Sequence, residues 1–148
     1  MDTTDQAIVR LLLAQGRISH EQLAQEVHLS RPAVHERIKR LQEEKILRGY
    51  KAVVDWGALG LPLSVFIWVR GSGTARETGR VLLQLSNSSA LIEECHSVTG
   101  EWCVMLKARV ADSHALETLI EQIRAIEGIQ GTFTSLVLST ISEGQDAL

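Results

Sequence analysis

The chain has 148 residues, with 15 Lys or Arg against 18 Asp or Glu, so its formal net charge is −3. Its hydrophobic content of 45% excludes intrinsic disorder as the main state. No apolar run approaches the ~18 residues of a membrane span, and the N-terminus lacks the basic region of a signal peptide. Two cysteines are too few for a disulfide framework, so we expect a cytoplasmic protein without membrane association.

The mild acidity of the chain conceals a basic segment. Residues 1–60 carry a net charge of +1 and residues 61–148 a net charge of −4. Between Ser30 and Lys51 there are seven basic and three acidic residues. Such a run can be an ordinary solvated helix face, so its structural setting decides what it means.

Three short helices are predicted in the first half. Apolar residues at helical spacing predict the first helix over residues 5–15. Ser19, with Gln22 three residues later, has the spacing of a capping box and predicts the start of a second helix. Ser30 caps a third helix, with Pro32 in its first turn, where the missing N–H costs little.

The second and third helices are separated by a tight turn, which predicts a helix-turn-helix. Val34, Ile38 and Leu41 share the buried face of the third helix, and its outer face is mostly basic. In a helix-turn-helix the second helix of the motif, which is the third helix of this chain, lies in the DNA major groove. Double-stranded DNA is therefore the expected partner. A plain three-helix bundle is the alternative, which the basic outer face disfavours. The predicted DNA-contacting residues are Ser30, Arg31, Pro32, His35, Glu36, Lys39, Arg40 and Lys51.

A short extended segment and a turn-rich stretch follow the third helix. Residues 50–54 have strand-forming composition and predict a small wing or a linking strand, which would make the motif a winged helix-turn-helix. Glycines and a proline mark residues 56–63 as a linker. We therefore expect a DNA-binding domain over residues 1–55 and a second domain over residues 64–148.

The second domain reads as βαββαβ, the ferredoxin-like order, which makes the whole chain α+β. The strands are expected over residues 64–70, 91–98, 102–110 and 129–142. One helix is expected from Thr74 to Leu85 with Val81 facing inward, and another begins at Asp112 or Ser113 and is closed by Gly128.

Two helices cover only one face of such a sheet, and the other face needs another partner. Phe66 and Trp68 share one face of the first strand. Two placements remain open: the open face, where they would form a dimerisation surface, or beneath the chain's own helices.

The two halves together resemble the Lrp/AsnC family of transcription regulators. The resemblance rests on residues 29–41, 49–55, 59–60 and 95–102, in that order and spacing. It implies a helix-turn-helix that binds DNA as a homodimer, and a second domain that dimerises and assembles into tetramers or octamers. It also implies a small-molecule effector, usually an amino acid, bound between subunits. The implied effector-binding residues are Thr99, Gly100, Glu101, Trp102 and Cys103, with Thr134 and Ser135 on the last strand.

The turn itself has suitable chemistry for such a ligand. Gly100 permits close approach to backbone N–H groups, Glu101 can accept an ammonium group, and Trp102 offers an apolar wall. The family often has a carboxylate where this chain has Cys103. An amino-acid effector, another ligand and a simple assembly contact therefore all remain open.

Enzymatic and metal-binding functions have little support in the sequence. Cys95, His96 and Cys103 fit no common zinc spacing, and no nucleophile elbow, P-loop or HExxH stretch occurs. Tetrapyrrole decarboxylases resemble the same two-part architecture and would use His96, but a basic helix face has no role there. We therefore expect a transcription regulator without cofactor or metal; an effector-free protein that wraps DNA is the other alternative.

Overall fold

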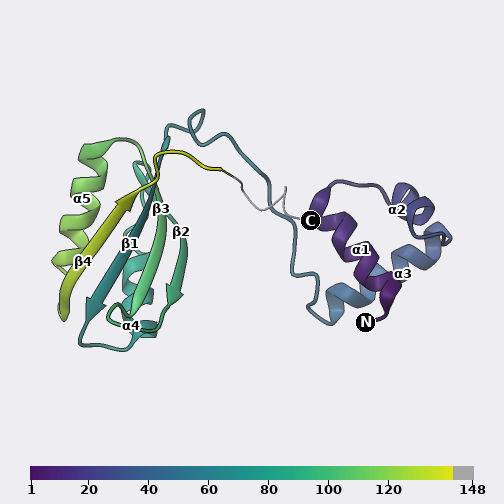
Figure 1. Cartoon of the computed structure of the whole chain (residues 1–148), viewed down its shortest axis with the longest axis horizontal. Helices are drawn as coiled ribbons and strands as arrows, with labels where there is room; N and C mark the ends of the chain where they lie inside the picture. Colours follow the sequence, from purple (N-terminus) through teal and green to yellow (C-terminus); the bar gives the residue numbers. More distant parts are fainter. Residues whose placement is uncertain (142–148) are drawn as a thin grey trace. The chain divides into compact units, whose positions relative to one another are not determined.

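A computed structural model describes residues 1–141 and shows two compact units, residues 1–53 and residues 54–139, with Thr140 and Ile141 grouped with the first (Figure 1). The first contains helices α1 (Thr3–Ala14), α2 (His20–Glu26) and α3 (Arg31–Glu43). The second contains β1 (Leu63–Gly71), α4 (Ala75–Leu83), β2 (Ala90–Ser97), β3 (Val104–Val110), α5 (Ser113–Arg124) and β4 (Ile129–Leu136).

The three helices of the first unit pack around one small apolar core. Its fully buried members are Ile8 from α1, Leu23 from α2, and Val34 and Leu41 from α3. Because α3 contributes a stripe at helical spacing, its opposite side faces solvent. The predicted helix-turn-helix is confirmed.

Side-chain caps fix where the helices begin. Ser19 and Gln22 form the predicted capping box of α2. α1 begins at Thr3, earlier than predicted, because Asp2 and Asp5 form a second capping box that the sequence analysis missed.

The predicted wing is not formed. Residues 48–54 adopt neither helix nor strand, and among the residues described here no strand lies in the first unit. A single extended segment has no neighbouring strand there to satisfy its backbone groups. Residues 56–63 fall within the second unit, where Asp55 accepts hydrogen bonds from the amides of Gly57 and Ala58, and Leu61 is buried.

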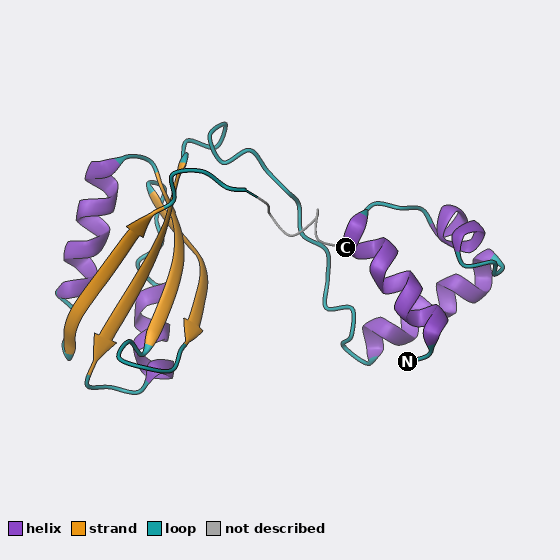
Figure 2. Ribbon diagram, in the orientation of Figure 1, coloured by secondary structure: helices purple, strands orange, loops and turns teal. Residues whose placement is uncertain are grey.

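The second unit is a four-stranded antiparallel sheet in the order β2-β3-β1-β4, with α4 and α5 on one face (Figure 2). This confirms the ferredoxin-like prediction. The core between sheet and helices contains Val65, Ile67 and Val69 of β1 together with Leu82 of α4 and Leu119 of α5, all at most 1% exposed.

Several predicted details of this unit are wrong. β4 ends at Leu136 and not at Ser142, a residue that lies outside those described. Val81 is 43% exposed and not inward. The buried face of α4 passes instead through Thr78, Gly79 and Leu82. A Cβ on Gly79 would lie 3.0 Å from the Cys95 sulfur, so the missing side chain lets α4 approach β2 on this face.

Candidate functional site

The first candidate site is the solvent face of α3. Ser30 caps this helix by accepting a hydrogen bond from the amide of Ala33 at 3.3 Å. Pro32 has no N–H and the amide of Val34 donates to the carbonyl of Ser30 at 3.1 Å, so within the described chain the first turn leaves the amide of Arg31 without a partner. The helix dipole favours an anion such as phosphate at this end.

The structure places most predicted DNA-contacting residues on this exposed surface. Lys39 and Arg31 have no ion-pair partner among residues 1–141. The ring of His35 lies 5.5 Å from that of His20 on α2. The exposed predicted residues on and before α3 are Ser30, Arg31, Pro32, His35, Glu36, Lys39 and Arg40. Lys51 is also exposed, but it lies on the segment where the wing is absent.

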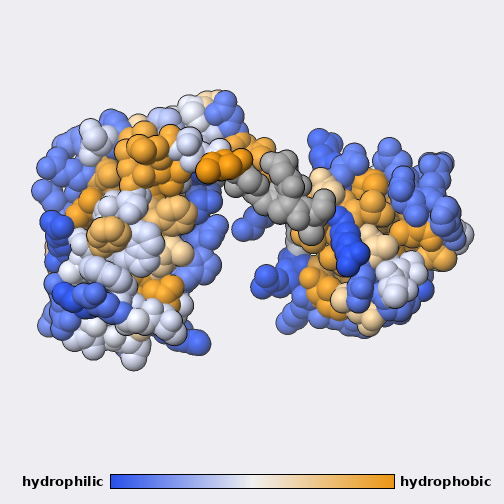
Figure 3. Space-filling model, viewed as in Figure 1, coloured by the Kyte–Doolittle hydropathy of each residue, from blue (hydrophilic) through white to orange (hydrophobic). Residues whose placement is uncertain are grey.

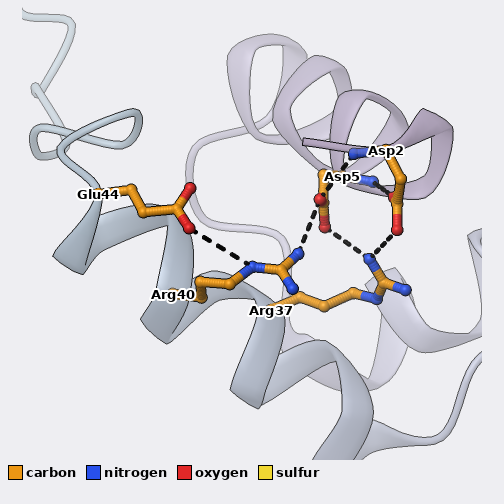
Figure 4. A network of polar contacts seen from close by, with 5 residues as sticks. All are labelled: Asp2, Asp5, Arg37, Arg40 and Glu44. Carbon is orange, nitrogen blue, oxygen red and sulfur yellow. Dashed lines mark hydrogen bonds and ion pairs between the residues drawn. The ribbon is translucent and has the colours of Figure 1, made fainter.

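Arg40 differs from the other predicted residues because its guanidinium is engaged by carboxylates (Figure 4). Its Nη2 lies 2.8 Å from Oδ2 of Asp5, and its Nε lies 4.0 Å from Glu44. Arg37, which the sequence analysis did not select, donates from Nη1 to both Asp2 and Asp5 at 2.7 Å.

These contacts shift the pKa values of the groups involved. The hydrogen bond from the amide of Asp5, with that from Arg37, lowers the pKa of Asp2 to about 2. Burial would raise the pKa of Asp5, but the amide of Asp2 and the two guanidinium groups outweigh it, and the pKa is lowered. Hydrogen bonds to Asp2 and Asp5 raise the pKa of Arg37.

The second candidate site is the turn between β2 and β3. Val98 donates to the carbonyl of Cys103 at 3.1 Å, which closes the turn, and Gly100 adopts φ of +105° within it. That conformation is easily adopted only without a side chain, so the turn requires glycine here.

The turn lies against residues of β1 and β4 that the sequence analysis did not select. Glu101 forms an ion pair with Arg70 at 2.6 Å, and the Arg70 guanidinium lies 5.5 Å from the ring centre of Trp102. Phe133 also contacts Trp102, with ring centres 6.2 Å apart. Arg70 lies two residues after Trp68, so alternation along the strand places both on the same face of the sheet. This was the sequence signal that could have identified Arg70.

The remaining predicted effector residues do not gather in one place. Thr134 pairs with Ile67 and lies on the helix-covered face, whereas Ser135 pairs with Phe66 on the opposite face. The Cys103 thiol donates to the carbonyl of Val69 at 3.3 Å and packs against the core. Thr99 is exposed in the turn.

The structure decides between the two placements that the sequence left undecided for Phe66 and Trp68. Phe66 and Trp68 alternate with the buried residues of β1 and therefore lie on the face opposite the helices. Trp68 contacts Phe66 and Phe133, with ring centres 6.2 and 5.4 Å away. Figure 3 shows apolar side chains over the strands on this face. We call Phe66, Trp68, Trp102 and Phe133 the aromatic cluster.

Other features support no separate site. In the described part of the chain, no group of three or more His, Cys, Asp or Glu residues can hold a metal ion. His96 is exposed and contacts Glu94 at 2.9 Å. Among residues 1–141, none of the helices has the length and apolarity needed to span a bilayer.

Comparison with known proteins covers both units. Residues 1–42 match the AsnC-type helix-turn-helix domain, and residues 64–147 match the Lrp/AsnC ligand binding domain. The chain is 32% identical to the HTH-type transcriptional regulator LrpA of Mycobacterium tuberculosis over 95% of this chain and 91% of the relative. It is 31% identical to the leucine-responsive regulatory protein of Escherichia coli over 97% of this chain and 88% of the relative.

Solved structures show the same fold. One is the feast or famine regulatory protein from M. tuberculosis complexed with L-methionine, with a TM-score of 0.86, 31% identity, and coverage of 96% of this chain and 95% of that one. Another is a transcriptional regulator from Neisseria meningitidis in complex with L-methionine, with a TM-score of 0.84, 29% identity, and coverage of 97% and 93%.

Proposed function

The chain belongs to the Lrp/AsnC family of DNA-binding transcription regulators, and on that basis we propose that it binds specific DNA sites through α3 and responds to an amino acid. Its relatives are transcription regulators, which confirms the prediction that it is not an enzyme.

The proposal that α3 binds DNA rests on the division of this helix into a buried apolar face and an exposed polar face. Its apolar stripe is buried against α1 and α2, while Arg31, His35, Glu36 and Lys39 are exposed together. Lys39 and Arg31 supply charge for phosphates. His35 and Glu36 can read base edges, since a carboxylate accepts from the cytosine amino group and repels phosphate.

Two substitutions separate these roles. Lys39→Ala is expected to weaken binding to every duplex by a similar factor, and Glu36→Ala to change the preference among sequences. Electrophoretic mobility shifts on a selected site and on unrelated duplexes measure both. Equal affinities for wild type and the triple variant Arg31→Ala, Lys39→Ala, Arg40→Ala would exclude α3 as the DNA-binding element.

We propose that the open face of the sheet is the homodimer interface, and that dimers assemble further into tetramers or octamers. Phe133 is 52% exposed there beside Trp68, and a sheet face of this kind gains stability when a second copy covers it. Sedimentation velocity of Trp68→Lys, compared with Arg76→Glu on the exposed outer face of α4, tests this. A Trp68→Lys protein with the wild-type sedimentation coefficient argues against the interface.

We propose an amino-acid effector at the turn between β2 and β3. Two similar structures hold L-methionine. Charges of both signs meet at the turn, with Glu101 in the turn itself and Arg70 at the end of β1. Arg70 can bind an α-carboxylate and Glu101 an α-ammonium group. Because these two side chains already pair at 2.6 Å, a zwitterionic ligand would replace one ion pair with two.

Titration calorimetry with L-methionine and other amino acids tests this assignment. Arg70→Gln is expected to abolish binding, whereas Arg76→Gln is the matched control on the exposed surface of α4. An effector changes DNA affinity only by favouring one assembly or conformation over another. If no amino acid changes either the DNA affinity or the oligomer size, the alternative of an effector-free protein that wraps DNA is favoured.

A further inference from the structure

A buried carboxylate joins the DNA-reading helix to the start of α1. Asp5 is fully buried, while its partners Arg37 and Arg40 come from α3, 32 and 35 residues further along the chain. With Asp2 these residues form what we call the Asp5 cluster (Figure 4).

Both carboxylate oxygens of Asp5 are occupied. Oδ1 accepts from Nη1 of Arg37 at 2.7 Å, and Oδ2 accepts from Nη2 of Arg40 at 2.8 Å and from the amide of Asp2 at 3.0 Å. The Asp2 carboxylate accepts a second contact from Arg37 at 2.7 Å. Two carboxylates therefore neutralise two guanidinium groups.

The two arginines nevertheless border the surface that reads DNA. A shallow groove along α3 is lined by Ala33, Glu36, Arg37, Lys39, Arg40 and Glu43. The side chain of Arg37 is 26% exposed and that of Arg40 is 49% exposed. Arginine binds phosphate readily through its planar fork of donors. Both side chains already line this groove, so their donors would be free for a phosphate there once the carboxylates no longer held them.

A phosphate competes poorly for these groups while Asp5 is charged. Removing a guanidinium would leave a buried carboxylate without full compensation, which is strongly unfavourable. The contact of Arg40 with Glu44, at 4.0 Å between exposed groups, offers little such resistance. Asp5 is therefore the residue that decides whether Arg40 is available, and it shares the hold on Arg37 with Asp2.

We propose that Asp5 withholds Arg37 and Arg40 from DNA phosphates and thereby lowers the sequence-independent part of the affinity for DNA. The proposal rests on the proposed role of α3 in DNA binding. It makes Asp5 a residue that sets the strength of phosphate binding without contacting DNA. It also reduces the usable charge of the basic segment, because two of its seven basic residues are neutralised within the unit.

The test is Asp5→Asn, which keeps the size and hydrogen-bonding oxygen of the side chain. Fluorescence anisotropy measures affinity for a 40-base-pair duplex of arbitrary sequence, and for a site selected from a random pool, at several salt concentrations. Each new phosphate contact adds about 0.9 to the slope of log affinity against log salt. We expect the slope on the arbitrary duplex to steepen by about 1 to 2 for each protomer.

Glu26→Gln is the matched control. It changes the charge of the first unit equally, but Glu26 lies exposed on α2 and has no ion-pair partner in the described chain. The triple variant Asp5→Asn, Arg37→Gln, Arg40→Gln should return the slope to that of wild type. A wild-type slope for Asp5→Asn with native circular dichroism overturns the proposal, as does an equal steepening by Glu26→Gln.

A second comparison does not depend on the folding of an Asp5 variant. Arg40 and Lys39 are adjacent on α3, and only Arg40 belongs to the Asp5 cluster. Arg40→Gln should leave the salt slope unchanged, while Lys39→Ala lowers it. A reduction by Arg40→Gln as large as that by Lys39→Ala overturns the proposal. Absence of salt-dependent DNA binding by the wild-type protein would instead contradict the proposed role of α3.

Discussion

Replacing Lys39 with alanine should change the salt dependence of DNA binding by a calculable amount. Lys39 is exposed on α3 and has no ion-pair partner among residues 1–141, so its charge is available to a phosphate. One phosphate contact corresponds to about 0.9 in the slope of log affinity against log salt. The proposed dimer holds two copies of Lys39, and its slope should therefore fall by about 1.8.

This slope predicts how the weakening depends on salt. Between ~50 and ~200 mM salt, a slope difference of about 1.8 corresponds to about a 12-fold difference in relative affinity. The loss caused by Lys39→Ala should thus be about 12 times larger at the lower salt concentration. Fluorescence anisotropy on an arbitrary duplex measures it, with Arg76→Ala on α4 as a control of equal charge change.

Two results would refute the reasoning. A constant weakening at all salt concentrations would show that Lys39 makes no phosphate contact and acts through packing or base recognition. An equal change for Arg76→Ala would show that the net charge of the protein, rather than its placement on α3, governs binding.

Three further predictions concern stability. Ser30→Ala should lower the free energy of unfolding by about 1 kcal/mol, because the amide of Ala33 loses its capping oxygen; urea unfolding measures this, and an unchanged midpoint would contradict the cap. The pKa values of Asp2 and Asp5 are lowered in the folded state, so their stabilisation is complete above the ordinary value of 3.8 and is lost as the pH falls, through about 2 for Asp2. The stability difference between wild type and Asp5→Asn should accordingly shrink between about pH 5 and about pH 2, and a constant difference would argue against the ion pairs. Leu119→Ala should cost about 2 to 5 kcal/mol in the second unit, since this side chain is 1% exposed; hydrogen exchange should show unchanged protection in α1 to α3, and equal loss in both units would contradict their separate cores.

Local sequence signals were sufficient for most of the secondary structure. Ser19 and Gln22 lie three residues apart and define the start of α2 without help from the rest of the chain. The same holds for Ser30 and for the stripe of Val34, Ile38 and Leu41. A cap or a helical stripe acts within about two turns of a helix, so its residues can be read directly from their spacing.

Contacts between distant residues could not be predicted in this way. The sequence places Arg40 on the flank of a basic helix, and only the packing of α1 against α3 shows that Asp5 neutralises it. Glu101 meets Arg70 across 31 residues because β1 and β3 are adjacent in the sheet.

The sequence by itself therefore determined the helix-turn-helix, the βαββαβ order and the exposed basic face of α3, since each depends on spacing along the chain. Only the tertiary structure decided which charges on that face remain available and which face of the sheet the aromatic cluster occupies. Strand register decided which face the aromatic cluster occupies, and it placed Thr134 and Ser135 on opposite faces of the sheet. The burial of Asp5 decided which charges on α3 remain available, because a carboxylate without water must take its compensating charges from whatever packs against it.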